Sequence, residues 1–203
     1  MARIETLEGL RKLYKEPNER ARLKQLDRLD RHCRRFIALS PLLVLASGGE
    51  AGGNDASPRG GEPGFVRVLD DRTLAIPDRP GNNRIDSLAN LLRSPEVGLL
   101  FLVPGVDEVL RVNGRAEIRD DPELCASFAV EGRRPATVTL VAVREAYLHC
   151  GKALMRAQLW DPARYVARKS LPSIGEMIKE QANLAAPAEN QDAMVVRYRE
   201  TLY

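Results

Sequence analysis

The stretch DASPRGGEPGFVRVLDDRTLAIPDRPGNNRIDSLANLL, residues 55–92, carries the signals that decide the fold. GFVRVLD at 64–70 and TLAIP at 73–77 are short apolar segments joined by turn-forming residues, and this pattern predicts a β-hairpin. Residues 84–95 then place apolar side chains at helical spacing and end at a proline, which predicts a short helix. A loop punctuated by Gly and Pro precedes the hairpin, and a turn rich in Asn and Arg follows it.

Strand signals continue on both sides of this stretch. Segments that are rich in β-branched residues or that alternate in polarity occur at 42–48, 97–103, 108–119 and 136–150. Turn residues such as PGVDE separate them, and one further short helix is predicted from Asp121. Because the strands outnumber the helices, the predicted fold class is mainly β with flanking helices, an antiparallel β-barrel with helices packed around it.

The region before the first strand predicts one amphipathic helix from Asn18, the expected N-cap, to Leu39. The other face of this helix is rich in Arg and Lys, which leaves open an interaction module that binds a polyanion through this helix. Aspartates interrupt the basic run and no aromatic residues interleave with it, so a solvated face is favoured. We expect one domain over 1–203, with a helical extension at about 1–40 and a helical tail at about 173–203.

Composition narrows the function classes. The chain has 203 residues, 44% hydrophobic and 29% charged, which is ordinary for one globular domain. Its net charge of +3 is too small to favour bulk attraction to nucleic acid or to a membrane surface. The first ten residues, MARIETLEGL, lack the apolar core of a signal peptide, and the longest apolar run, at 97–103, is too short to span a bilayer. We therefore expect a cytoplasmic protein.

The cysteines predict neither a disulfide framework nor a metal site. Cys33, Cys125 and Cys150 are odd in number, widely spaced and outside any C-x-x-C pattern. Two of them directly follow the chain's only histidines, His32 and His149, but adjacent residues on a strand point to opposite faces and rarely bind one ion.

The turn PGNNR at 80–84 has the residue types of an anion site. A phosphate needs several donors that converge from different directions, and guanidinium groups, amides and free N–H groups at a helix start supply them. Ser87 lies in the first turn of the predicted helix, and Arg59 comes from the segment before the hairpin. The alternative is an ordinary turn with solvated arginines, and the residues alone favour neither interpretation.

Three segments in order, at 57–92, VLRVNGRAEI at 109–118 and AYLHCGKALMRAQLW at 146–160, carry a family resemblance. They resemble the FMN-binding split-barrel superfamily, the pyridoxamine 5′-phosphate oxidase-like proteins, and in particular the bacterial subgroup labelled probable FMN-dependent enzymes. The resemblance implies a split β-barrel, FMN as the cofactor, and an oxidoreductase that acts on an unidentified small molecule.

The resemblance also implies the residues that hold the cofactor. The FMN phosphate and flavin edge would be held by Arg59, by the backbone at Ile76 and Pro77, and by Asn83, Arg84 and Ser87. The later segment would come from a partner subunit, with His149 lining the flavin pocket and Lys152 and Arg156 holding anions of the cofactor or substrate. For Lys152 and Arg156 a plain helix-surface pair at i, i+4 stays open, and for His149 a core histidine.

The reaction itself is open. Pyridoxamine phosphate oxidases end in an Arg-x-His-type signature that recognises the substrate, whereas this chain ends in VVRYRETLY. A non-catalytic protein that handles FMN or haem is therefore the alternative to an oxidoreductase. We further predict a homodimer with both flavin sites at the subunit boundary, because Leu99, Phe101 and Val103 lie on a segment that is hydrophobic on both faces and needs cover.

Overall fold

The computed structural model describes residues 3–48 and 53–203 of the chain. Met1 and Ala2, at the start of the segment tested for a signal peptide, lie outside the described residues. The strands are β1 (Leu42–Gly48), β2 (Asn54–Gly60), β3 (Arg67–Val68), β4 (Thr73–Pro77), β5 (Glu96–Leu102), β6 (Val109–Arg119) and β7 (Val138–His149). The hairpin β3–β4 and the strands β1, β5, β6 and β7 confirm the sequence prediction.

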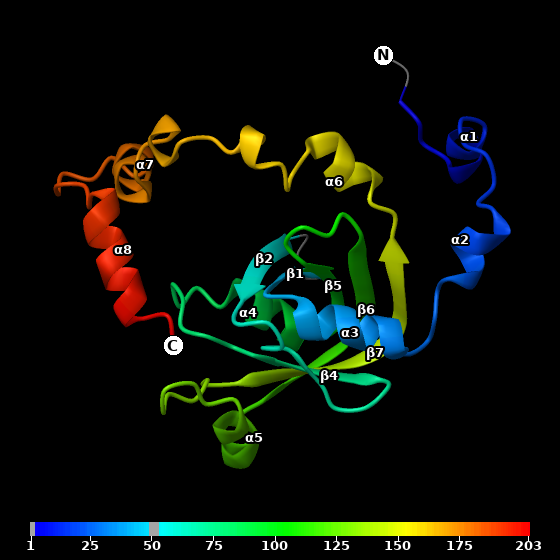
Figure 1. Cartoon of the computed structure of the whole chain (residues 1–203), viewed down its shortest axis with the longest axis horizontal. Coiled ribbons are helices and arrows are strands. Elements are labelled where there is room, and N and C mark those ends of the chain that lie inside the picture. Colours follow the sequence, from blue (N-terminus) through cyan, green and yellow to red (C-terminus); the bar gives the residue numbers. More distant parts are fainter. Residues whose placement is uncertain (1–2, 49–52) are drawn as a thin grey trace.

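The seven strands form one antiparallel sheet in the order β2-β1-β5-β6-β7-β4-β3. The sheet is strongly curved (Figure 1), but β2 and β3 remain its two edges, so the strands do not close into a barrel by hydrogen bonding. The predicted class, mainly β with flanking helices, is confirmed, and among the described strands the barrel stays open between β2 and β3.

Strand β2 is the element that sequence reasoning missed. The residues NDASPRG were interpreted as a loop because Asp, Pro and Gly disfavour strands. The segment pairs with β1 alone, from Gly60 opposite Leu42 to Asn54 opposite Gly48. Proline is tolerated on an edge strand, where one row of N–H groups has no neighbour to bond. Arg59 therefore projects from a strand and not from a loop.

The single helix predicted from Asn18 to Leu39 is two helices, α2 (Glu19–Leu23) and α3 (Arg31–Leu39). Asn18 caps the first as expected. Between them Leu26 pairs with Ala146 of β7 through two backbone hydrogen bonds of 3.0 and 2.8 Å, and Asp30 accepts from the first N–H groups of α3. The aspartate that looked like a break in a charge run is thus an N-cap.

The main core lies on one face of the sheet. On β1 and β5, Leu43 is opposite Phe101 and Leu45 is opposite Leu99, and all four side chains are buried. Leu99 and Phe101 are therefore covered within their own chain, and the argument that they require a partner subunit is wrong.

Helices cover one face of the sheet and part of the other. Cys33 and Ile37 of α3 and Leu91 of α4 (Asp86–Arg93) join the main core. A second, smaller cluster lies on the other side of β4 and β7, where α5 (Pro122–Ser127) contributes Cys125. Because α5 covers that side, strand β4 is buried on both faces, and the loop that follows it starts from a rigid position.

The remaining helices lie at the ends of the chain and extend away from the sheet (Figure 1). They are α1 (Leu7–Arg11), α6 (Lys152–Ala157), the 3-10 turns η1 (Pro162–Arg164) and η2 (Arg168–Ser170), α7 (Ile174–Gln181) and α8 (Gln191–Glu200). The segment from α6 to Tyr203, called the C-terminal arm below, contacts the rest of the chain near both of its ends. Trp160 donates to the carbonyl of Val106 at 3.0 Å, and Arg133 donates to the carbonyls of Glu200 and Tyr203.

Within the described residues, no helix is long and apolar enough to cross a lipid bilayer. The same part of the chain gathers no three His, Cys, Asp or Glu side chains in a position to hold a metal ion.

Candidate functional site

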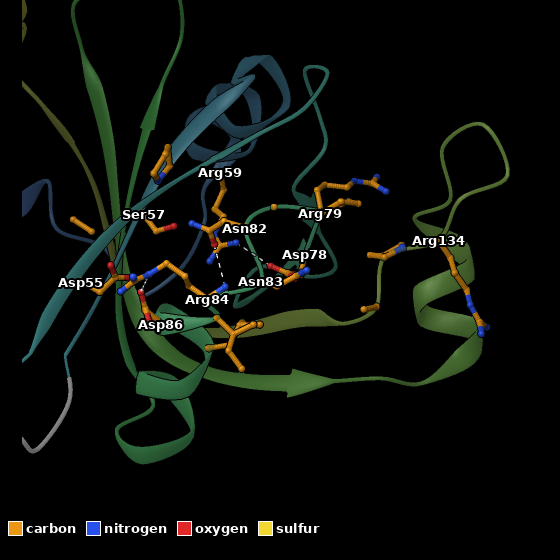
Figure 2. A pocket seen from close by; sticks show the side chains of 18 residues that line it. Asp55, Ser57, Arg59, Asp78, Arg79, Asn82, Asn83, Arg84, Asp86 and Arg134 are labelled. Carbon is orange, nitrogen blue, oxygen red and sulfur yellow. Dashed lines mark hydrogen bonds and ion pairs between the residues drawn. The ribbon is translucent and has the colours of Figure 1, made fainter. Parts of the chain in front are cut away.

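A pocket of about 480 Å³ opens beside the edge strand β2 (Figure 2). Its walls come from residues 55–59 of β2, the loop and helix start at 78–86, Leu88, and residues 134–136 before β7. These segments are distant in sequence, and the curvature of the sheet brings them together. Its volume lies in the range of small-molecule sites, roughly 300–1,000 Å³.

Arg59 is a largely enclosed charge in the pocket. Its Nη1 lies 2.9 Å from Oδ1 of Asp78, and the two side chains are only 21% and 23% exposed. The pair joins β2 to the loop that leaves β4, across the opening between the two sides of the sheet. The Nε–H of Arg59 is buried and has no hydrogen-bond partner.

Keeping Asp78 charged beside Arg59 costs free energy, because the carboxylate is partly buried. Burial raises the pKa of the Asp78 carboxyl above its usual value, and this effect outweighs the opposing influence of Arg59. What favours an anionic ligand here is Arg59, which is largely enclosed and has an unused donor, so a contact with it gains more than it would at an exposed site.

The turn before α4 carries the predicted Asn83 and Arg84. Both line the pocket, and Nε of Arg84 lies 2.8 Å from Oδ2 of Asp86. Asn83 and Ile85 have φ of 59° and 53°, in the left-handed region, which is unusual for a β-branched residue such as isoleucine. Strained backbone of this kind gathers at ligand sites.

Ser87 lies behind the pocket and not on its surface. It is 3% exposed, and its hydroxyl donates to a carboxylate oxygen of Asp55, which does line the pocket. Ser87 therefore positions Asp55 and fastens α4 to β2.

Ile76 and Pro77 also lie behind the lining. Both side chains are buried at the end of β4, opposite Thr139 and Val138 of β7, and the lining begins with the next residue, Asp78. Their packing fixes where the loop at 78–85 starts, so their place in the fold is structural support for the pocket wall.

The predicted site residues leave out five charged residues of the lining: Asp55, Asp78, Arg79, Asp86 and Arg134. Asp78 and Arg79 directly follow the buried strand β4, and that position was a signal that pointed to the pocket. Asp55 was hidden by the missed strand, and Arg134 is more than forty residues further along the chain. In Figure 2, Arg59 and Arg84 gather at the centre, whereas Arg79 and Arg134 lie to one side.

Arg79 connects the pocket to the C-terminal arm. Its Nη2 donates to the carbonyl of Phe128 at 2.9 Å, its Nε is buried without a partner, and its guanidinium lies 5.2 Å from the centre of the Tyr203 ring. The lining as a whole contains four arginines against three aspartates, so its charge balance favours an anion.

The sequence model of the family described as pyridoxamine 5′-phosphate oxidase matches residues 29–150, more than half of the chain and all seven strands. The chain belongs to the pyridoxamine 5′-phosphate oxidase family. The resemblance inferred from the sequence motifs is thereby confirmed. A comparison with curated proteins finds no match.

Several solved structures are similar. HupZ of Group A Streptococcus is 18% identical, with 59% of this chain and 92% of that chain covered and a TM-score of 0.48. A putative pyridoxamine 5′-phosphate oxidase from Lactobacillus delbrueckii is 21% identical over 61% and 98% of the two chains, with a TM-score of 0.48. An FMN-binding protein from Syntrophomonas wolfei is 11% identical over 58% and 83%, with a TM-score of 0.44. The assignment to the family rests on the match over residues 29–150 and not on these structures.

The predicted residues His149, Lys152 and Arg156 do not line the pocket of their own chain. His149 is the last residue of β7, and Lys152 and Arg156 lie on α6, which has no buried residue. The family match ends at residue 150, so the two basic residues of α6 lie outside the matched residues.

Proposed function

We propose that the pocket beside β2 binds the phosphate of FMN and that the protein is an FMN-binding oxidoreductase acting on a small molecule. The observation that carries this proposal is the buried, unpartnered Nε–H of Arg59 in a pocket with an excess of positive charge. A buried donor without a partner is rare in native proteins and indicates a missing acceptor. A phosphate oxygen is an acceptor that arginine binds strongly.

The residues around the pocket fit this ligand. Arg59 would supply its guanidinium from the enclosed side, and Arg84 and Asn83 from the turn before α4. The first N–H groups of α4, an eight-residue helix, add the partial positive charge of a helix start. Ser87 would act indirectly, because it holds Asp55 in the lining through its hydroxyl.

FMN, when bound, supplies the electron or hydride transfer through its ring. The protein's part is to bind the phosphate, orient the ring and exclude water. Ile76 and Pro77 contribute by fixing the end of β4, so that the ring edge would meet a rigid backbone. This division of labour requires no separate acid–base residue in the chain.

We also propose that the protein is a homodimer in which each pocket is completed by His149, Lys152 and Arg156 of the second subunit. The convex face of β1 and β5 carries the apolar side chains of Leu42, Val44, Leu100 and Leu102. Leu42 is 39% exposed, and the other three are only partly buried. A contiguous apolar surface of this kind favours association with a second copy.

The phosphate assignment is tested by titrating the apoprotein with FMN and with riboflavin, which lacks the phosphate. We expect FMN to bind at least about 30-fold more tightly, in line with the loss of a charge-assisted contact. Equal affinities would contradict the proposal. The absorbance spectrum of the protein as purified provides a second test, because flavin, haem and an empty protein have different spectra.

The shared site is tested by mixing two variants, Arg59→Gln and the double variant Lys152→Glu with Arg156→Glu. In a heterodimer both lesions fall in one pocket, which leaves the other intact, so FMN should bind with half the normal stoichiometry. Mass measurement verifies that the heterodimer has formed. A verified heterodimer that binds no FMN, or a monomer that binds it normally, would mean that each site is built within one chain.

A further inference from the structure

A second group of basic and aromatic side chains lies outside the pocket, at the end of β7. Figure 1 shows this end of the strand, where the chain leads into α6. Arg111 is opposite Tyr147 in the register of β6 and β7, and His149 follows two residues later on the same face. Lys24 reaches this face from the segment after α2, where its Nζ lies 5.4 Å from the centre of the Tyr147 ring. These four residues are called the Arg111 cluster below.

Several contacts hold the Arg111 cluster together. Nη1 of Arg111 donates to the hydroxyl of Tyr147 at 3.0 Å, and Nζ of Lys24 donates to the carbonyl of Leu148 at 2.8 Å. The rings of Tyr147 and His149 are tilted against each other with their centres 5.1 Å apart. The basic groups are therefore held in place by neutral partners, which leaves their positive charge uncompensated.

No ion pair involves Lys24 or Arg111 among residues 3–48 and 53–203. Glu145 lies two residues before Tyr147 on β7, on the same face of the sheet. Its two carboxylate oxygens accept hydrogen bonds from the side-chain amides of Gln25 and Asn113. Asp107, Glu108 and the exposed Cys150 also lie at this end of the sheet, and Lys152 and Arg156 follow on α6. The Cβ of Asp107 packs against Gly151.

His149 has an unsatisfied ring nitrogen in this setting. Its Nε2 is buried and has no hydrogen-bond partner. Burial lowers the pKa of His149, and the nearby positive charges of Arg111 and Lys24 lower it further. Burial and the two cations therefore favour the neutral imidazole, and Nε2 has no partner within the chain.

The Arg111 cluster has the features of a binding site for a flat anionic molecule. It holds two cations without an ion pair, a ring nitrogen without a partner, and two aromatic rings. Arginine matches the geometry of a carboxylate or phosphate, and aromatic rings pack against other flat groups. We propose that the Arg111 cluster binds the carboxylate or phosphate group of a flat organic molecule. The anion site stands on the contacts above. Its assignment as the substrate site beside the flavin rests on the proposed function, in which His149 lines the flavin pocket.

The chain offers an internal control for a direct test, because it has only two histidines, His32 and His149. His32 is exposed on α3, and its Nε2 accepts from Nε of Arg31. NMR of the imidazole rings in the full chain follows both pKa values, and His149→Gln assigns the signals. The probes are benzoate, phenyl phosphate and the neutral analogue benzamide.

We expect benzoate or phenyl phosphate to raise the pKa of His149 by about 1, because a nearby anion favours the charged imidazolium. The ring signals of His32 should not respond to the anions, and benzamide should change the signals of neither histidine. Arg111→Gln should abolish the effect, whereas the matched control Arg115→Gln, on the same exposed face of β6, should preserve it. An equal effect of benzamide, or an undiminished effect in Arg111→Gln, would overturn the anion site.

Repeating the titration with FMN-loaded protein separates the two parts of the inference. If the ligand is a substrate, benzoate should still raise the pKa of His149 and should change the flavin absorbance at the same concentrations. If FMN loading abolishes the effect, the cluster holds the cofactor and the substrate assignment is overturned. If FMN does not bind at all while the benzoate effect persists, the proposed function fails and the anion site stands.

Discussion

Two arginine–aspartate pairs line the same pocket, and they differ in burial rather than in distance. Arg59 and Asp78 approach to 2.9 Å with side chains 21% and 23% exposed, whereas Arg84 and Asp86 approach to 2.8 Å with side chains 73% and 50% exposed. The enclosed pair spans two sides of the sheet. The exposed pair joins residues two apart in one turn.

Burial determines what each pair contributes. Water and salt screen the exposed pair, so losing it changes little. The enclosed pair is largely desolvated, so exchanging Asp78 for a ligand as the partner of Arg59 has a large effect on the free energy of binding. We therefore expect the Arg59 side of the pocket to set the affinity for an anion and the Arg84 side to affect mainly its salt dependence.

The largest effect is expected for Arg59→Gln, which removes the enclosed charge and keeps much of the side-chain volume. FMN binding should weaken by about 2–5 kcal/mol, the usual cost of truncating a buried charged partner. Riboflavin binding should change little, because no phosphate is involved. Arg119→Gln is the matched control, since Arg119 pairs with Glu117 and Asp121 and does not line the pocket. A loss no greater than that in the control would show that the phosphate binds elsewhere.

The next effect concerns Asp78, the competitor of the phosphate for Arg59. Asp78→Asn removes the negative charge, so FMN should bind about tenfold more tightly at neutral pH. Burial raises the pKa of Asp78, so the wild-type carboxyl takes up its proton at a higher pH than a free aspartate. As the pH falls through that pKa, the wild type becomes neutral at this position and the ratio of the two affinities should approach one.

Titration of both proteins at several pH values measures this ratio. The ratio removes the contribution of FMN's own phosphate, which both proteins share. A ratio that stays constant with pH would mean that Asp78 is not the titrating group.

Most of the fold follows from patterns that are local in the sequence. β-Branched content or alternating polarity predicted β1 and β3 to β7, and helical spacing with a final proline predicted α4. The failures have one cause, which is that long-range pairing overrides local preference. β2 is a strand because β1 offers it an edge, and the helix at 18–39 is interrupted because Leu26 pairs with Ala146 of β7.

The candidate site divides in the same way. Arg59, Asn83 and Arg84 were identified by residue type near a hairpin, and they do line one pocket. The sequence did not predict how deeply each residue is buried. The enclosed Arg59 and the exposed Arg84 were therefore treated as equally important for anion binding. Asp78 was missed because a carboxylate argues against an anion site. Only the structure shows that Asp78 forms an ion pair with Arg59.

A smaller effect is expected at Ile85, which shapes the exposed side of the pocket. It has φ of 53° at the start of α4 and is 60% exposed. Asparagine tolerates this left-handed conformation better than a β-branched residue, so Ile85→Asn should raise the free energy of unfolding by about 1 kcal/mol. Leu92→Asn, at an exposed position in the same helix, should give no gain. Chemical denaturation measures both, and equal changes would contradict the strain at Ile85.

The smallest effect is expected for Arg84→Gln, and it bears most directly on the comparison of the two pairs. Because Arg84 is largely exposed and already paired with Asp86, FMN binding should weaken only on the order of two- to fivefold at about 0.15 M salt. The difference from wild type should grow at lower salt and vanish at higher salt, whereas the loss in Arg59→Gln should persist. Isothermal titration of both variants across salt concentrations measures this contrast. A loss in Arg84→Gln as large and as salt-resistant as that in Arg59→Gln would mean that ligand binding encloses Arg84, so that the two pairs differ only in the absence of ligand.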